Sequence, residues 1–173
     1  MHIKEIYKAI YRHLDDLTPL PLDCGELCGK LCCSSYDDDE TGMYLFPGEE
    51  ALFANNDGFK IIDSDFTYKN SKCAKLVCCT RPCERSERPL SCRIFPLIPY
   101  FRKGSDVRII LDPRAVSCPL THPEASPYIS REFKLEVLKA FRLLSHFSEI
   151  ADFLDALTDI LDDFNTLRGN NND

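Results

Sequence analysis

The chain lacks any apolar run of about 18 residues, the shortest stretch typical of a membrane-spanning helix. Residues 1–6 also lack the basic region followed by an apolar stretch that marks an export signal. We therefore expect a cytoplasmic protein with no membrane partner. In a reducing cytosol, clustered cysteines indicate metal or redox chemistry rather than structural disulfides.

Histidines and glycine-rich loops are also scarce. No Ser-His-Asp or Cys-His catalytic set can be assembled from the four histidines, at positions 2, 13, 122 and 146. No glycine-rich cofactor loop is present. The net charge of −7 argues against general nucleic-acid binding, which needs a basic surface. We expect a metal-binding protein rather than an enzyme, and the sequence identifies no protein partner.

Cysteine, in contrast, is abundant, with ten among 173 residues. A gap of three residues between cysteines lies within the spacing that lets two thiolates reach one tetrahedral ion. Four thiols within ten residues would be rare in an ordinary surface loop. We predict that the cysteines are metal ligands, namely Cys24, Cys28, Cys32, Cys33, Cys73, Cys78, Cys79, Cys83, Cys92 and Cys118.

Two pairs of cysteines are adjacent in the sequence, Cys32–Cys33 and Cys78–Cys79. Neighbouring side chains diverge, so both members of a pair seldom bind the same ion. If each pair gives one ligand to a given site, two cysteines are spare and the other eight fill two four-cysteine sites. Alternatively, the extra members bridge two ions in one polynuclear cluster. The sequence leaves both arrangements open.

Basic residues are concentrated around the second group of cysteines, between residues 72 and 103. Four thiolates around a divalent cation carry a net charge of about −2, which is costly to bury. Guanidinium groups that donate to the sulfur atoms would offset this charge. They can equally be solvated charges or partners of the acidic run at residues 37–40. The candidates are Arg81, Arg85, Arg88 and Arg93.

Apolar periodicity predicts amphipathic helices at both ends of the chain, with a break near His146. The centre has strand and turn signals, whereas residues 73–96, dense in arginine and proline, are not expected to form one long regular element. The elements predicted there are strands at 43–46 and 59–62, a short helix at 47–54 and a hairpin at 97–111.

These elements predict a single α+β domain over residues 1–168. Its centre, residues 24–118, would be a small, irregular, cysteine-rich metal-binding unit with short strands and a hairpin. The N-terminal helix (1–18) and two C-terminal helices (130–168) would pack against this centre. A disordered tail would follow at 169–173.

Two motifs resemble a bacterial family of cysteine-cluster proteins, described as zinc- or iron-chelating domains. The first is Cys24-x3-Cys28-x3-Cys32-Cys33, similar to the C-x(2–3)-C-x(2–3)-C-C of that family. The second is a further cysteine followed by R-P-x-x-C-R-x-F-P, matched by Cys83, Arg88, Pro89, Cys92, Arg93, Phe95 and Pro96. Cys73 and Cys118 match less fixed positions, and Cys78 and Cys79 fit poorly. The resemblance covers residues 24–118 and implies metal chelation without an established reaction.

The metal is open between zinc and iron. The C-x3-C spacing favours zinc, as does the lack of a redox-partner signature, and we favour zinc by a small margin. Cys118-Pro119 and the abundance of thiols favour an iron–sulfur cluster. His122 could complete a site, although a lone histidine is more often a surface residue. The resemblance also implies an alternative function, because larger proteins that methylate flagellin lysines share this type of cysteine cluster. The chain would then be an iron–sulfur enzyme or enzyme component.

Overall fold

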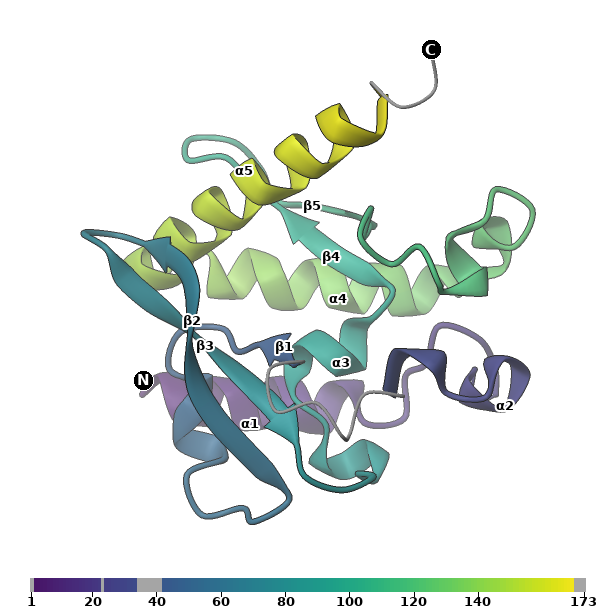
Figure 1. Cartoon of the computed structure of the whole chain (residues 1–173), viewed down its shortest axis with the longest axis horizontal. Coiled ribbons are helices and arrows are strands. Elements are labelled where there is room, and N and C mark those ends of the chain that lie inside the picture. Colours follow the sequence, from purple (N-terminus) through teal and green to yellow (C-terminus); the bar gives the residue numbers. More distant parts are fainter. Residues whose placement is uncertain (1, 23, 34–41, 170–173) are drawn as a thin grey trace.

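The computed structural model describes residues 2–22, 24–33 and 42–169 (Figure 1). Mixed helices and strands confirm the predicted α+β class. The long helices are the three that apolar periodicity predicts: α1 (Ile3–Leu14), α4 (Arg131–Leu144) and α5 (Ser148–Gly169). The break between α4 and α5 includes His146, as predicted. The acidic run at 37–40 and residues 170–173 of the predicted tail lie outside the described residues.

A three-stranded antiparallel sheet has the order β1-β3-β2. Its strands are β1 (Met43–Tyr44), β2 (Phe59–Tyr68) and β3 (Lys72–Cys79). As expected, residues 73–96 do not form one long regular element, but they begin with β3, a strand that the sequence did not predict and that pairs along β2. In the register, Cys79 lies opposite Phe59, and Lys72 lies opposite Tyr68. This hairpin carries Cys79 to one end of the sheet and leaves Cys73 at the other.

The second sheet is the predicted hairpin, β4 (Leu97–Tyr100) with β5 (Arg108–Leu111). It contacts both α4 and α5, and the Phe101 backbone N–H donates to Thr158 Oγ1 of α5 at 3.0 Å. The remaining described elements are short: α2 (Gly25–Cys28), η1 (Leu31–Cys33), η2 (Glu49–Leu52), η3 (Arg85–Glu87), α3 (Leu90–Ile94), η4 (Pro119–Thr121) and η5 (Ser126–Tyr128). The short helix expected at 47–54 corresponds to η2.

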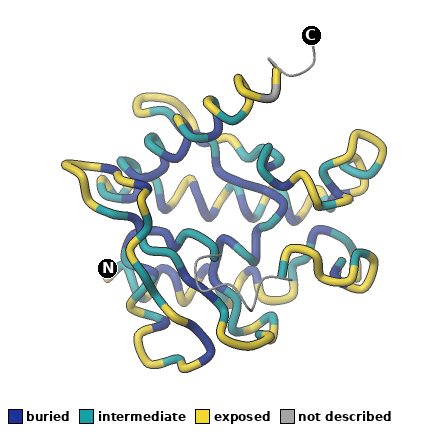
Figure 2. The backbone as a smooth tube through the Cα atoms, viewed as in Figure 1, coloured by how far each residue is buried: buried dark blue, intermediate teal, exposed yellow. Residues whose placement is uncertain are grey.

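The main apolar core draws on both ends of the chain, and Figure 2 shows its buried backbone along α1, α4 and β4. Phe46, which follows β1, packs edge-to-face on Phe141 of α4 and Phe153 of α5, with centroid distances of 4.8 and 5.6 Å. Such aromatic pairs add to the stabilisation from burial. The terminal helices therefore form much of the core against which the cysteine-rich centre packs. No helix within the described ranges is long and apolar enough to cross a membrane.

A buried carboxylate fixes α3 against α1. Glu49 is fully buried, and its carboxylate accepts the backbone N–H of Phe46 at 2.9 Å and that of Leu90 at 2.6 Å. The Tyr11 hydroxyl of α1 also donates to Glu49. Because Leu90 begins the helix that carries Cys92, this network sets the position of that cysteine relative to α1.

Candidate metal centre

Four cysteines form an outer group on the side of the molecule where α2 lies. Cys24 precedes α2 and Cys28 ends it one turn later, so both lie on one face of the helix. Gly29 and Lys30 then take left-handed conformations, with φ of 62° and 58°, and reverse the chain toward Cys32. Cys118, far along the sequence, lines the same small pocket as these three cysteines. The outer group is therefore Cys24, Cys28, Cys32 and Cys118.

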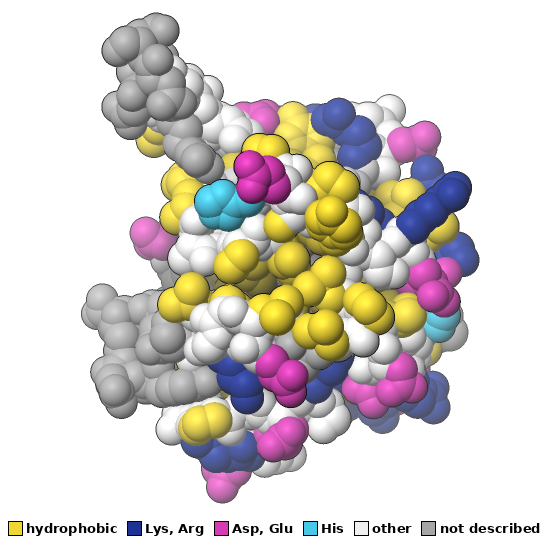
Figure 3. Space-filling model, turned by 90° about the vertical axis from the view of Figure 1, so that its right-hand side faces the viewer, with side chains coloured by type: hydrophobic (Ala, Val, Ile, Leu, Met, Phe, Trp, Pro, Cys, Tyr) yellow, Lys and Arg dark blue, Asp and Glu magenta, His cyan; other side chains and the backbone are white. Residues whose placement is uncertain are grey.

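Apolar side chains surround the outer group. Leu27, Leu31 and Phe95 line the pocket together with its cysteines. Leu27 and Leu31 are also exposed at the surface, with Val116 and Tyr128. Figure 3 shows apolar side chains gathered across the middle of the face on which α2 lies, around a hollow. The thiols of this group are thus set in apolar rather than charged surroundings.

Four other cysteines form an inner group that three separate segments supply. Cys79 ends β3, Cys83 follows four residues later, Cys92 lies in α3 and Cys33 ends η1. A hydrogen bond from the Cys79 thiol lowers the pKa of Cys83 to about 6, and the Arg88 guanidinium acts in the same direction. Burial raises the pKa of Cys92, and negative charge on Cys33 and Cys83 raises it further. These mutual effects show that the four thiols lie close to one another.

The two groups meet at the adjacent pair Cys32–Cys33. Their Sγ atoms are 3.9 Å apart, yet Cys32 faces the outer group and Cys33 the inner group. A hydrogen bond from Cys32 lowers the pKa of Cys33 to about 7, and the positive charge of Arg88 lowers it further. The same hydrogen bond, together with burial, raises the pKa of Cys32. Divergence of neighbouring side chains thus gives one cysteine to each group.

Cys73 and Cys78 lie apart from both groups. Adjacent strand residues point to opposite faces, so Cys78, which is buried, points away from the face of Cys79. At a rise of about 3.3 Å per strand residue, Cys73 lies about 20 Å from Cys79. Cys73 is therefore too far away to bind the same ion as Cys79. His122 is exposed at the end of η4.

Of the four candidate arginines, Arg88 is the one whose guanidinium lowers the pKa values of the inner thiols Cys33 and Cys83. Arg81 forms a two-bond ion pair with Glu87, at 2.8 and 3.1 Å. Arg85 donates to carbonyl oxygens at the end of α1, including that of Asp15 at 2.9 Å. Arg93 is buried and bonds to Asp15 and to backbone carbonyls. Three of the four thus serve the fold, which the clustering of charge in the sequence does not reveal.

The thiols gather without forming a closed coordination shell. Within the described residues, no three Cys, His, Asp or Glu side chains converge tightly enough to hold an ion as they stand. All ten cysteines fall inside the described ranges, and the structure has them as thiols rather than disulfides. Binding of an ion would therefore require the thiols of a group to move closer together.

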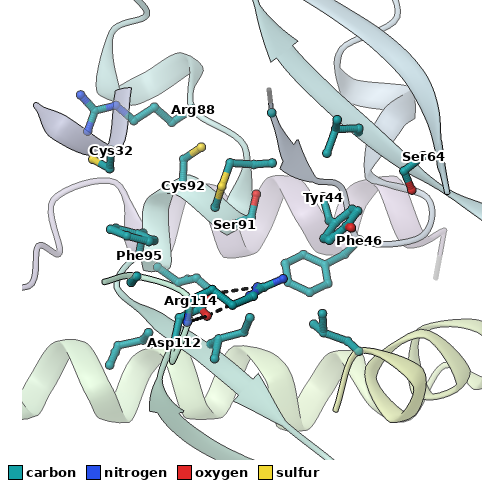
Figure 4. Close-up of a pocket in the computed structure, with 18 of the residues that line it drawn as sticks. Cys32, Tyr44, Phe46, Ser64, Arg88, Ser91, Cys92, Phe95, Asp112 and Arg114 are labelled. Atoms are coloured by element: carbon teal, nitrogen blue, oxygen red, sulfur yellow. Dashed lines mark hydrogen bonds and ion pairs between the residues drawn. The ribbon is translucent and has the colours of Figure 1, made fainter. Parts of the chain in front are cut away.

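A cavity of about 910 Å³ adjoins the inner group (Figure 4). Cys33 and Cys92 line one part of it, and the ion pair of Asp112 with Arg114 lines another. No sequence motif marks Asp112 and Arg114. The available signal is the D-P-R tripeptide directly after a predicted strand, where polar side chains commonly line sites.

No family model, no curated protein and no solved structure matches this chain.

Proposed function

We propose that this chain is a metal-binding protein in which thiolates hold the ions, in a structural or accessory role. Each of the two cysteine groups would supply one four-cysteine site. The observation that carries the proposal is that Cys33, Cys79, Cys83 and Cys92, supplied by three separate segments, lie near enough to shift one another's pKa values.

Electrostatics support the inner group as a cation site. Two of its thiols, Cys33 and Cys83, have pKa values of about 7 and about 6, so both ionise near neutral pH. Several partly buried thiolates repel one another, and a bound cation would cancel that repulsion. Arg88 would offset the remaining negative charge, since four thiolates exceed the charge of one divalent ion.

The outer group supports a second site of the same kind. Cys24 and Cys28 lie one helical turn apart, and the reversal at Gly29 returns Cys32 toward them. Cys118 approaches from the segment before η4. An ion here would tie α2 and η1 to the C-terminal half of the chain, a cross-link that short elements with little core of their own would need.

Zinc is the metal we favour for both sites. Zn²⁺ accepts four thiolates in tetrahedral geometry with a sulfur distance of about 2.3 Å, and it tolerates loop-supplied ligands. A reducing cytoplasm is the compartment that this proposal requires, because oxidation would convert the gathered thiols to disulfides. The resemblance of the two cysteine motifs to those of zinc- or iron-chelating proteins supports metal binding without selecting between the two metals.

Metal analysis of protein purified without oxygen tests the proposal. We expect about two zinc ions per chain, a colourless solution and eight thiols protected from alkylation until a chelator is added. Absence of bound metal in protein whose ten thiols all react freely would overturn the proposal. Five disulfides in protein kept free of oxygen would overturn it as well.

An iron–sulfur enzyme is the second candidate function. The observation that favours it is the cavity beside Cys33 and Cys92, since a reactive cluster needs room for a substrate next to it. Brown protein with absorption near about 400 nm and inorganic sulfide would select this candidate. Colourless zinc protein would reject it.

A further inference from the structure

The cavity described above is built like a small-molecule site. Its volume of about 910 Å³ falls within the usual range for ligand pockets, about 300–1,000 Å³. Most of its wall is apolar, with Phe46, Phe95 and Phe153 among the contributing side chains. A few polar groups interrupt this wall, which is the composition that orients an organic ligand.

Arg114 supplies a fixed hydrogen-bond donor to this cavity. Its Nε and Nη2 atoms donate to the two oxygens of Asp112, at 2.9 and 2.8 Å, and its backbone N–H donates to Oδ1 at 2.9 Å. Both oxygens of the Asp112 carboxylate are therefore engaged, and together they hold the guanidinium in one orientation. The third nitrogen, Nη1, has no hydrogen-bond partner among the described residues, so it retains two N–H groups for a ligand.

Ser91 supplies a second donor. Its side chain is nine-tenths buried and lines the cavity, yet its Oγ has no hydrogen-bond partner within the described part of the chain. A buried hydroxyl left without a partner is destabilising, because it loses the hydrogen bonds that water would supply. In the view of Figure 4, Ser91 lies above Arg114, and both residues line the same cavity.

We propose that the cavity binds an organic carboxylate with an apolar body. The carboxylate would accept hydrogen bonds from Arg114 Nη1 and Ser91 Oγ, and the apolar body would pack on the aromatic wall. This inference does not depend on metal binding, because neither donor is a cysteine. It identifies a ligand class that the cysteine motifs do not indicate.

The polar groups of the cavity favour an anion over a cation. The oxygens of Asp112 are occupied by three donors from Arg114. Asp63 lies 2.6 Å from the Lys75 ammonium group, which neutralises it. Asp65 is exposed to solvent, where its charge is screened. The carboxylates of the lining thus have a donor or solvent, whereas Ser91 Oγ and Arg114 Nη1 have no acceptor among the described residues, and Arg88 adds positive charge beside Cys33.

The chain has no tryptophan, so indole fluorescence can report binding directly. The probe is indole-3-butyrate, titrated with the protein as purified, and its matched analogues are indole-3-butyramide and tryptamine. We expect saturable, blue-shifted emission with the acid, and affinity at least about tenfold lower for the amide and the amine, because a charge-assisted hydrogen bond is lost. Hexanoate and decanoate should compete with the probe.

Two substitutions locate the site. Ser91→Ala should weaken binding of the acid about tenfold without lowering the stability of the protein, because it removes a hydroxyl that has no partner. Arg114→Gln should weaken binding more strongly. The matched control is Arg108→Gln, which alters an exposed arginine over the Tyr100 ring, outside the cavity lining. The metal content of each sample shows whether a loss of binding follows from loss of metal.

The proposal would be overturned if neither the indole acid nor the alkanoates bind saturably to protein that retains its fold. Equal affinity for the acid, amide and amine would overturn it too. Unchanged affinity in Ser91→Ala and Arg114→Gln would place the ligand elsewhere and reject the site. Because Ser91→Ala is expected to fold normally, the test does not rest on Arg114→Gln alone.

Discussion

The guanidinium of Arg93 lies over the ring of Tyr11, 4.5 Å from its centroid, in the interior of the protein. Its Nη1 donates to Asp15 at 2.9 Å, and its Nε donates to the Arg88 carbonyl at 2.8 Å. Nη2 donates to the Ser86 carbonyl at 2.6 Å. Arg93 thus joins α1 to the backbone of Arg88. In the R-P-x-x-C-R motif, the first arginine, Arg88, lowers the pKa values of the inner thiols, and the second, Arg93, fixes the backbone of the first by a hydrogen bond.

Replacement of Arg93 should therefore destabilise the fold. Arg93→Lys keeps the charge but loses the planar geometry that reaches three acceptors, and we expect a loss of about 2–4 kcal/mol in the free energy of unfolding. Urea denaturation measures this loss. Arg108→Lys, which also alters an arginine over a tyrosine ring but at the surface, should cost less than about 1 kcal/mol. A similar loss in both variants would contradict the role given to the buried arginine.

The elements that sequence reasoning predicts well are those with a regular apolar period. Helices α1, α4 and α5 each have an apolar face and a polar face, and the β4–β5 hairpin has a turn between two apolar runs. Strand β3 was not predicted, because five of its eight residues are lysine or cysteine and its cysteines have spacings that also suit metal ligands. The pattern is compatible with a strand or with a metal-binding loop, and only the pairing with β2 identifies it as a strand.

The sequence likewise predicts one part of the candidate site and not the rest. Spacing and resemblance single out the cysteines, but they do not reveal that Cys32 and Cys33 serve different groups. That assignment depends on where Cys118 and Cys79 lie in the folded chain. Ser91 carries no sequence signal, and the D-P-R tripeptide alone does not identify Arg114, because the relevance of both residues arises from a cavity that distant segments line.

The structure predicts which cysteines are spare. Cys79→Ser should remove one metal ion per chain, because Cys79 belongs to the inner group. Cys73→Ser and Cys78→Ala should leave the metal content unchanged, although Cys78→Ala should cost about 1 kcal/mol because it opens a small space in the core. Metal analysis and urea denaturation of the same samples separate the two effects. Loss of metal in Cys73→Ser would show that the grouping is incorrect.

Arg88 should raise the metal affinity of the inner site without being a ligand. Arg88→Gln removes the positive charge that lowers the pKa values of Cys33 and Cys83, so protons should compete better with the metal. We expect metal affinity to fall about 10–100-fold at the inner site, measured by competition with a chelator at neutral pH. Arg81→Gln is the matched control, because Arg81 is two residues from Cys83 but pairs with Glu87. Equal losses in both variants would point to a general effect of net charge.

Glu49 should make stability depend on pH. Complete burial raises the pKa of Glu49 from 4.5 to about 7, even though hydrogen bonds from Tyr11, Leu90 and Phe46 favour its charged form. Between these two values, the folded protein holds a proton that the unfolded chain has released. The stabilisation is therefore fully present below pH 4.5 and is lost as pH rises through about 7. The loss amounts to about 3 kcal/mol, which is the size of the pKa shift expressed as free energy.

Glu49→Gln isolates this contribution, because glutamine has a similar shape but does not titrate. Thiols also titrate in this range, but their contribution is common to both proteins and cancels in the difference. We expect the unfolding free energy of the wild type minus that of Glu49→Gln to fall by about 3 kcal/mol between pH 4.5 and 7.5, by urea denaturation at several pH values. The variant loses at least one of the backbone hydrogen bonds to Glu49, which shifts the whole curve without changing its slope. A constant difference across this range would mean that Glu49 keeps its charge in the folded protein, stabilised by the donors from α1 and α3.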